Sequence, residues 1–139
     1  MHSAKIVHRD LKLENIMVEL SANDQGHTSM ICKVTDFGFA TVTETNPSLQ
    51  LKLGTPLFMA PEVIEGSGYS HKVDVWALGV ITYAVLTSQY PFNGVSKDQI
   101  YALIRDPNSG PNYAHLDKYW QNGAMVKDFL KKCLNKNPN

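Results

Sequence analysis

The sequence has no excess of charge of either sign, because 13 Lys and Arg residues balance 13 Asp and Glu residues in a chain of 139. A balanced chain has no net field that would attract nucleic acid or an anionic membrane. Its longest apolar run, residues 73–86, is interrupted by Asp74 and is shorter than the roughly 20 residues that cross a bilayer. Residues 1–9 lack the apolar core of a signal peptide. We therefore expect a cytoplasmic or nuclear protein with no membrane span and no nucleic-acid partner.

Cysteine is scarce as well: Cys32 and Cys133 stand alone, without CxxC spacing. We expect both to be buried, reduced thiols, as in an intracellular protein. The five histidines show no HxxxH or HxxH pair, so a zinc site is not expected. The length suffices for one compact domain with its own core.

Hydrophobic periodicity predicts a mostly α-helical chain with a small β-hairpin near its start. Alternating residues at 15–20 and 30–35 predict two strands joined by the polar turn 21–29. Helical patterns occupy residues 73–86, about 97–104, and 124–134. Residues 41–53 are predicted to form an exposed, mobile loop. A second loop, residues 108–122, carries three aromatic residues that we expect to pack against the helices: Tyr113, Tyr119 and Trp120.

Three short motifs carry the chemistry: VHRDLKLEN at 7–15, DFG at 36–38 and APE at 60–62. Phosphoryl transfer needs a group that orients a hydroxyl, metal ligands and a cation that balances developing charge. Asp10 fits the first task and Lys12 the last, while Asn15 and Asp36 offer oxygen ligands of the kind that Mg²⁺ prefers. Each residue alone is more often a surface or turn residue, but chance agreement of all three motifs is negligible.

In this order the motifs resemble the catalytic loop, the magnesium-binding turn and the end of the activation segment of eukaryotic protein kinases. The resemblance implies a protein-kinase-like C-lobe, of α+β class, and phosphorylation of protein substrates that depends on ATP and Mg²⁺. Lys12 and the segment Gly54-Thr55-Pro56 are typical of the serine/threonine type.

The resemblance also implies roles for the residues around the nucleotide. Asp10 matches the catalytic base and Lys12 a contact of the γ-phosphate. Asn15 and Asp36 match the two metal ligands, and Met17 matches the floor of the adenine pocket, although periodicity alone makes Met17 a core strand residue.

Further matches are structural or regulatory. His8 and Phe37 match an apolar stack that ties the catalytic loop to the Asp-Phe-Gly turn, so His8 is not expected to act as a base. Thr55 matches a threonine that hydrogen-bonds the catalytic Asp and Lys, with a plain loop threonine as the alternative. Asp74 matches a buried Asp that accepts hydrogen bonds from the catalytic-loop backbone, which a buried carboxylate needs.

Several segments resemble the calcium/calmodulin-dependent kinase group: residues 54–62, Tyr69-Ser70, Tyr90-Pro91-Phe92, Trp120 and residues 126–134. That group often prefers substrates with an Arg upstream of the phosphorylated residue. Glu14 has two readings that the sequence does not separate, a contact for such an Arg and a solvated charge.

Arg9, beside Asp10, implies a kinase in which a phosphate on the activation segment pairs with that Arg. The sequence departs from the family here, because Leu51 stands three residues before Gly54, where a phosphorylatable Thr is common. Either another residue receives the phosphate or Arg9 is left without a phosphate partner. The nearby candidates are Thr41, Thr43, Thr45 and Ser48.

Other kinase motifs are absent, since the sequence has neither the glycine-rich motif GxGxxG nor the Val-Ala-Ile-Lys strand that supplies the ATP-binding lysine. We therefore expect residues 1–139 to be a partial kinase domain without the N-lobe and the extreme C-terminal part. Glu62 would then lack the Arg that usually pairs with it, and Met1 would be internal to a longer chain. The alternatives are a catalytically inactive binding module and, less well supported by the APE segment, a small-molecule phosphotransferase.

Overall fold

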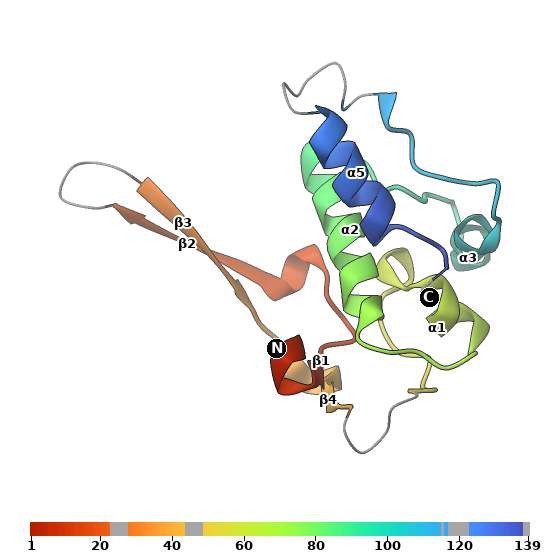
Figure 1. Cartoon of the computed structure of the whole chain (residues 1–139), viewed down its shortest axis with the longest axis horizontal. Helices are drawn as coiled ribbons and strands as arrows, with labels where there is room; N and C mark the ends of the chain where they lie inside the picture. Colours follow the sequence, from red (N-terminus) through yellow and green to blue (C-terminus); the bar gives the residue numbers. More distant parts are fainter. Residues whose placement is uncertain (23–27, 44–48, 115, 117–122, 138–139) are drawn as a thin grey trace.

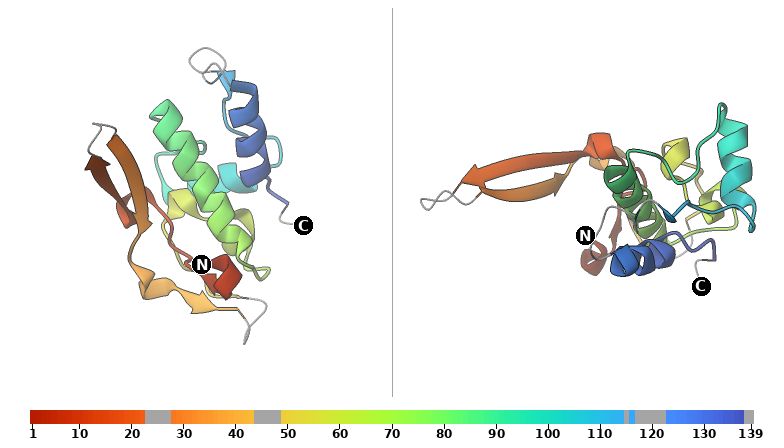
Figure 2. Two further views of the ribbon diagram at one scale, coloured as in Figure 1. Left: turned by 60° about the vertical axis from the view of Figure 1, so that its left-hand side comes forward. Right: turned by 90° about the horizontal axis from the view of Figure 1, so that it is seen from above.

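A computed structural model of the chain describes residues 1–22, 28–43, 49–114, 116 and 123–137. A β-hairpin projects from one side of a helical body in Figure 1, and Figure 2 shows the same separation from two further directions. The α+β character predicted from the sequence is confirmed, because the strands precede the helices along the chain.

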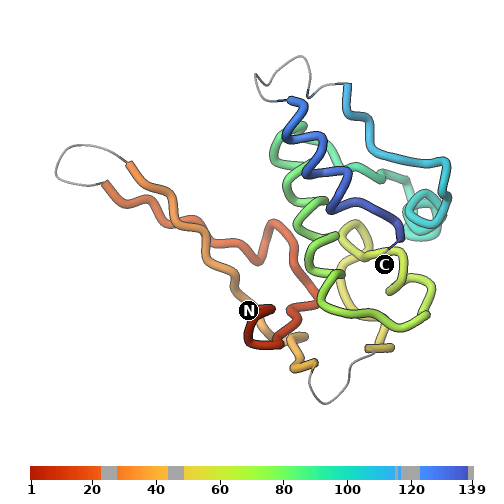
Figure 3. Tube along the Cα trace, in the orientation of Figure 1, coloured from red at the N-terminus to blue at the C-terminus, as the bar shows by residue number. Residues whose placement is uncertain are grey.

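Two short strands join the segments on either side of the hairpin. Strand β1 (Ile6–Val7) pairs antiparallel with β4 (Thr41–Val42), with Val7 opposite Thr41. The chain enters the catalytic-loop sequence directly after β1 and leaves the Asp-Phe-Gly turn shortly before β4. This pairing therefore brings the segments that carry the two motifs together beside the base of the hairpin, and their course can be followed in Figure 3.

The hairpin itself consists of β2 (Ile16–Ala22) and β3 (Thr28–Val34). Its register places Ile16 opposite Val34 and Leu20 opposite Met30, so one face is apolar along its length. The predicted strands are confirmed and are longer than expected toward the turn. Two expectations were wrong: Cys32 is exposed, and Met17 is 62% exposed rather than part of the core.

The helical body contains α1 (Pro61–Glu65), α2 (Lys72–Thr87), α3 (Lys97–Arg105) and α5 (Gly123–Cys133). The last three confirm the helices predicted from periodicity to within one or two residues. Sequence reasoning missed α1, although its proline start and the following Gly66, at φ 74°, are typical of helix ends. No helix in the described ranges is long and apolar enough to cross a membrane.

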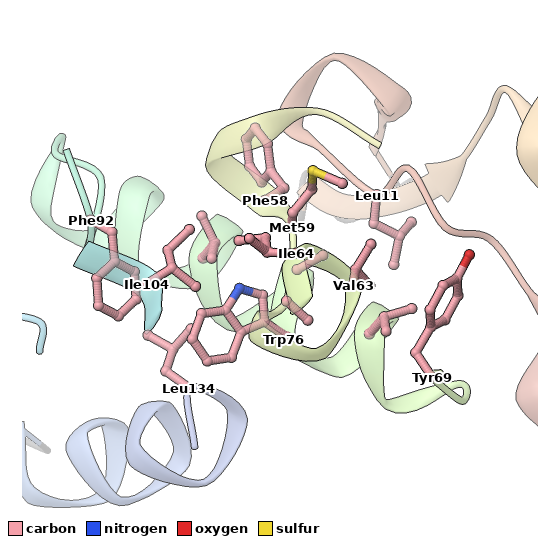
Figure 4. Close-up of a cluster of buried hydrophobic side chains, with 14 of the residues drawn as sticks. Leu11, Phe58, Met59, Val63, Ile64, Tyr69, Trp76, Phe92, Ile104 and Leu134 are labelled. Carbon is pink, nitrogen blue, oxygen red and sulfur yellow. The ribbon is translucent and has the colours of Figure 1, made fainter. Parts of the chain in front are cut away.

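The core is a cluster of buried hydrophobic side chains that come from several elements, as Figure 4 shows. Trp76 of α2 stacks on Phe92 at a centroid separation of 5.6 Å. Ile104 of α3 and Leu134, just after α5, pack into the same cluster. A second cluster joins Tyr83, Leu116 and Leu130 and includes the half-buried Tyr113. Of the loop aromatics predicted to pack on helices, Tyr113 does so, while Tyr119 and Trp120 lie outside the described residues.

The prediction of an exposed loop over residues 41–53 was wrong at its start and at Leu49, whereas residues 50–53 do lie outside helices and strands. Thr41 and Val42 form β4. Leu49 is buried and exchanges two backbone hydrogen bonds with Tyr69. Leu49, an apolar residue inside a polar segment, therefore fixes this segment against Tyr69. Periodicity could not detect the contact, because the two residues are 20 positions apart. Residues 44–48 lie outside the described ranges.

The packing of α2 against α5 gives a direct test through Gly79. A Cβ atom at this position would lie 2.7 Å from Cβ of Cys133 and 3.0 Å from Cδ2 of Leu134. We expect Gly79→Ala to lower the free energy of unfolding by about 1–3 kcal/mol, because overpacking outweighs the gain in helix propensity. Urea unfolding measures this change. Gly110→Ala is the control, since a Cβ there meets nothing within 4 Å; equal stabilities of the two variants would contradict the packing.

Candidate active site

A buried carboxylate on α2 holds the catalytic loop. Asp74 is 2% exposed, and its two oxygens accept hydrogen bonds from the backbone N–H groups of His8 and Arg9, both at 2.9 Å. Nε2 of His2 lies 2.8 Å from the same Oδ2 that His8 contacts. These are the backbone contacts that the family resemblance implied. They offset the desolvation of a buried charge and explain why a carboxylate interrupts the apolar run.

Asp74 also stabilises an unusual backbone conformation. Arg9 has φ 72°, in the left-handed region, which costs a non-glycine residue about 1–3 kcal/mol. Its amide is fixed by Asp74 while its Nε donates to the carbonyl of Phe39 at 2.6 Å. The turn at Arg9 therefore lies between α2 and the segment that follows the Asp-Phe-Gly motif.

His8 is fully buried and connects the loop to the strand that precedes Asp36. Its Nδ1 accepts a hydrogen bond from the backbone N–H of Asp10 at 3.3 Å, and its Nε2 lies 2.9 Å from the carbonyl of Thr35. Only the neutral tautomer protonated at Nε2 satisfies both contacts. The ring meets Phe37 edge-on, with centroids 5.0 Å apart. Both nitrogens of His8 are thus engaged in structural contacts.

Asp10 is the centre of a polar cluster and is 6% exposed. Its Oδ1 accepts hydrogen bonds from the backbone N–H and the hydroxyl of Thr55, at 3.0 and 2.9 Å. Its Oδ2 accepts one from Nζ of Lys12 at 2.9 Å, and Nζ also lies 3.4 Å from the Thr55 hydroxyl. Residues 45 positions apart therefore converge on one carboxylate, and Thr55 is no plain loop threonine.

The lysine of this cluster is held in its charged form. The hydrogen bond from Lys12 to Asp10 raises the pKa of the ammonium above its ordinary value, and the negative charges of Asp10, Glu14 and Asp36 act in the same direction, against desolvation. The Asp-Phe-Gly turn is held beside the catalytic loop by Thr35, which directly precedes Asp36: its carbonyl contacts Nε2 of His8, and its backbone N–H donates to the carbonyl of Asn15 at 2.9 Å.

The two predicted metal ligands fit a hard cation by their chemistry. Nδ2 of Asn15 donates to the backbone carbonyl of Asp10 at 2.9 Å, which leaves its Oδ1 as the acceptor atom. Asp36 is exposed and has a left-handed backbone conformation, with φ 59°. Its Oδ1 accepts a hydrogen bond from the N–H of Gly38 at 3.3 Å. One carboxylate and one amide oxygen suit Mg²⁺, which takes few protein ligands and retains waters and substrate phosphates. The described residues contain no group of three or more His, Cys, Asp or Glu suited to a metal.

Glu62 is not among the residues that contact Asp10. It is buried at the start of α1 and lines a cavity of about 330 Å³ together with Lys72 and Trp76. Burial raises the pKa of its carboxyl above the ordinary value, and the positive charge of Lys72 acts in the opposite direction. Nε1 of Trp76 is buried without a hydrogen-bond partner among the described residues.

Sequence reasoning missed His2 and the carbonyl of Thr35. His2 meets Asp74 from 72 positions away, and a backbone carbonyl leaves no residue-type signal. Met17 lies in β2, two positions after Asn15, and Glu14, next to Asn15 in sequence, is exposed.

A carboxylate paired with a lysine, beside two magnesium-type oxygens and mounted on a helical body, defines a kinase-like class of protein. The chain belongs to the protein kinase family, whose protein kinase domain matches it over residues 1–139.

Its relatives are serine/threonine kinases, including calcium-dependent ones. The chain is 44% identical over 108 residues to serine/threonine-protein kinase 33 of Bos taurus. The aligned residues make up 76% of this chain and 22% of that protein. It is 36% identical over 134 residues to calcium-dependent protein kinase 4 of Plasmodium falciparum (96% and 24%). It is also 36% identical over 135 residues to myosin light chain kinase A of Dictyostelium discoideum (96% and 43%). The chain thus spans less than half the length of these relatives. The resemblance to serine/threonine protein kinases, predicted from the motifs, is confirmed.

The raised pKa of Glu62 makes stability depend on pH. The unfolded chain releases this proton near the ordinary value of 4.5, whereas the folded chain releases it only at higher pH. The folded state therefore binds more protons between these values, and the stability contributed by Glu62 falls as pH rises through that window. We expect Glu62→Gln to raise the melting temperature at pH 7 and to lose this advantage below pH 4.5. Thermal unfolding across pH measures it. Constant differences at all pH values would contradict the assignment to Glu62.

Proposed function

We propose that the protein transfers the γ-phosphoryl group of ATP, with Mg²⁺, to serine or threonine hydroxyls of protein substrates. The observation that carries the proposal is the carboxylate of Asp10, held by Lys12 and Thr55. A carboxylate oxygen has two lone pairs. Oδ2 of Asp10, which accepts from Lys12, therefore keeps an acceptor site for the proton of a substrate hydroxyl.

In this proposal each side chain has one task. Asp10 orients the attacking hydroxyl and accepts its proton. The ammonium of Lys12, kept protonated by its raised pKa, balances charge on the transferred phosphoryl group. Asn15 and Asp36 would hold the metal, and Met17 would face the adenine. Bound Mg·ATP would supply the activated phosphoryl group, and Thr55 keeps the carboxylate and the lysine in one geometry.

We also propose that the chain is the C-lobe part of a longer kinase, acting in the cytoplasm or the nucleus. The greater length of its relatives supports this, as do the exposed apolar residues of the hairpin: Met17, Val18, Leu20, Met30 and Ile31. The mass of the endogenous protein on an immunoblot tests the idea. A band well above the 15.5 kDa of this chain supports it; a band at that mass contradicts it.

A second candidate is a binding module derived from a kinase and devoid of catalysis. Val18, Leu20 and Met30, which are exposed and share one face of the hairpin, favour it, because contiguous exposed apolar residues mark association sites. Such a module would still bind protein partners but would not require Asp10, which separates the two candidates.

Regulation by a phosphate is part of the leading proposal. Nε of Arg9 donates a hydrogen bond to the carbonyl of Phe39, while the terminal guanidinium nitrogens of Arg9 make no hydrogen bond to the described residues. They are therefore available to a phosphate on the activation segment. The candidates are Thr41, Thr43, Thr45 and Ser48, of which the last two lie outside the described residues. Phosphopeptide mapping of the active protein that finds none of them modified contradicts this part.

A preference for an Arg upstream of the acceptor is proposed for the exposed carboxylate of Glu14. In a set of peptides with and without that Arg, Glu14→Gln should reduce the ratio of their kcat/KM values severalfold. An unchanged ratio would make Glu14 a solvated surface charge.

The decisive variant is Asp10→Asn, assayed in the full-length protein by transfer of labelled phosphate from ATP to a Ser/Thr peptide. We expect kcat to fall by about 10²- to 10⁴-fold, because an amide cannot accept the proton. Asp128→Asn is the matched control, since Asp128 lies on α5 and forms an exposed ion pair with Lys132. Rates that Asp10→Asn leaves unchanged would refute the role of Asp10. Peptide binding without any transfer in the unmodified protein would favour the binding module.

A further inference from the structure

Three cations gather beside the segment that leads to Thr55. Nζ of Lys52 and Nη2 of Arg105 both donate to the carbonyl of Ile64, at 3.1 and 3.0 Å. The two cationic nitrogens are therefore no farther apart than the sum of those distances. Nζ of Lys52 and Nζ of Lys97 lie 4.7 and 5.4 Å from the ring centroid of Tyr101. We call Lys52, Lys97 and Arg105 the basic cluster.

The basic cluster has no counter-ion in the described part of the chain. None of its three side chains forms an ion pair within 4.0 Å with a described carboxylate. The acidic residues next to its members in sequence are Asp98 and Asp106. Oδ1 of Asp106 instead accepts a hydrogen bond from the N–H of Asn108 at 2.9 Å. In a chain with no net charge, this is a local excess of positive charge on exposed side chains.

Local stability accounts for only part of the cluster. A cation at the carbonyl of Ile64, near the C-terminus of α1, is favourable, but one cation would suffice. Lys97 is the first residue of α3, where the helix dipole disfavours a positive charge. Ser96 already caps that helix by accepting from the N–H of Gln99. The contact with Tyr101 offsets part of this cost without giving the ammonium an anionic partner.

The chain places the basic cluster near the catalytic carboxylate. Lys52 lies three residues before Thr55, a separation of at most about 11 Å along an extended chain, and Thr55 contacts Asp10 directly. The segment between them runs close to the catalytic loop: a Cβ on Gly54 would lie 3.0 Å from the carbonyl of Arg9. A peptide with its hydroxyl at Asp10 would bring a side chain a few residues away to Lys52.

We propose that the basic cluster binds an acidic side chain of the protein substrate, so that Lys52, Lys97 and Arg105 determine specificity. The ligand is the carboxylate of a Glu or Asp side chain a few residues from the acceptor hydroxyl. Arg105 and the lysines supply charge-assisted hydrogen bonds to it. This inference rests on the proposed phosphoryl transfer, but its binding step does not require that transfer to occur.

The experiment uses the full-length protein and a set of peptides with one acceptor serine. Each peptide carries a single Glu, or Gln in its place, at one of the positions flanking the serine. Two quantities are measured: kcat/KM for phosphate transfer and Kd from the fluorescence anisotropy of labelled peptide. We expect Glu to be preferred by about three- to tenfold at one or two adjacent positions, through KM and Kd and not kcat. The preference should weaken as KCl is raised.

Variants separate binding from a structural role. Lys52→Met keeps the apolar stem over Tyr101 and should bring the Glu/Gln ratio close to one, while Lys52→Glu should reverse it. Lys97→Met, at an exposed position, provides the same test should the Lys52 variants fail to fold. Lys131→Met is the matched control, because Lys131 also lies over a tyrosine ring, Tyr113 at 6.0 Å, but on α5.

The two proposals fail separately. Transfer to the peptides with no preference for Glu at any position, or a preference that Lys52→Met and Lys97→Met leave intact, overturns the assignment of the basic cluster. A Glu preference in Kd that these variants abolish, without transfer to any peptide, supports the basic cluster and contradicts the proposed phosphoryl transfer.

Discussion

The structure depends on the contact between the carboxylate of Asp74 and the backbone of the catalytic loop. Asp74 lies on the buried face of α2, and its carboxylate accepts hydrogen bonds from the consecutive backbone amides of His8 and Arg9. Because those amides directly precede Asp10, the position of the central carboxylate follows from a contact in the core. His2 adds a third donor, so that the buried charge is well satisfied and the left-handed turn at Arg9 is held in place.

A second constraint fixes the segment that faces the loop. Leu49 pairs with Tyr69 through the backbone, and the hydroxyl of Tyr69 donates to the carbonyl of Leu51 at 2.7 Å. Thr55 then ties the far end of the segment to Asp10. The segment between these anchors carries Lys52 and joins the candidate catalytic site to the basic cluster. Chemistry and substrate selection would therefore share one segment of the chain, residues 52–55.

Particular elements show how far the sequence could be interpreted. Residues 73–86, 97–104 and 124–134 were correctly predicted as helices because each is long enough to display the 3.6-residue period. Helix α1 was missed because five residues show no period, although Pro61 and Gly66 marked its ends. Cys32 was wrongly placed in the core, since alternation along β3 says which residues share a face but not whether anything covers it. Leu49 was wrongly placed in an exposed loop because its backbone partner, Tyr69, lies 20 positions away in the sequence.

The sequence by itself determined which chemical groups are present, in which order, and therefore the kinase family; closely spaced motifs preserve that information because their residues are covalently held near one another. Tertiary structure alone decided that certain distant groups meet: His2 with Asp74, Leu49 with Tyr69, and Lys52 with Arg105 at the carbonyl of Ile64. The physical reason is that burial and hydrogen-bond partners are set by how whole elements pack. A local pattern of residues contains the donors and the acceptors but not the distances between them.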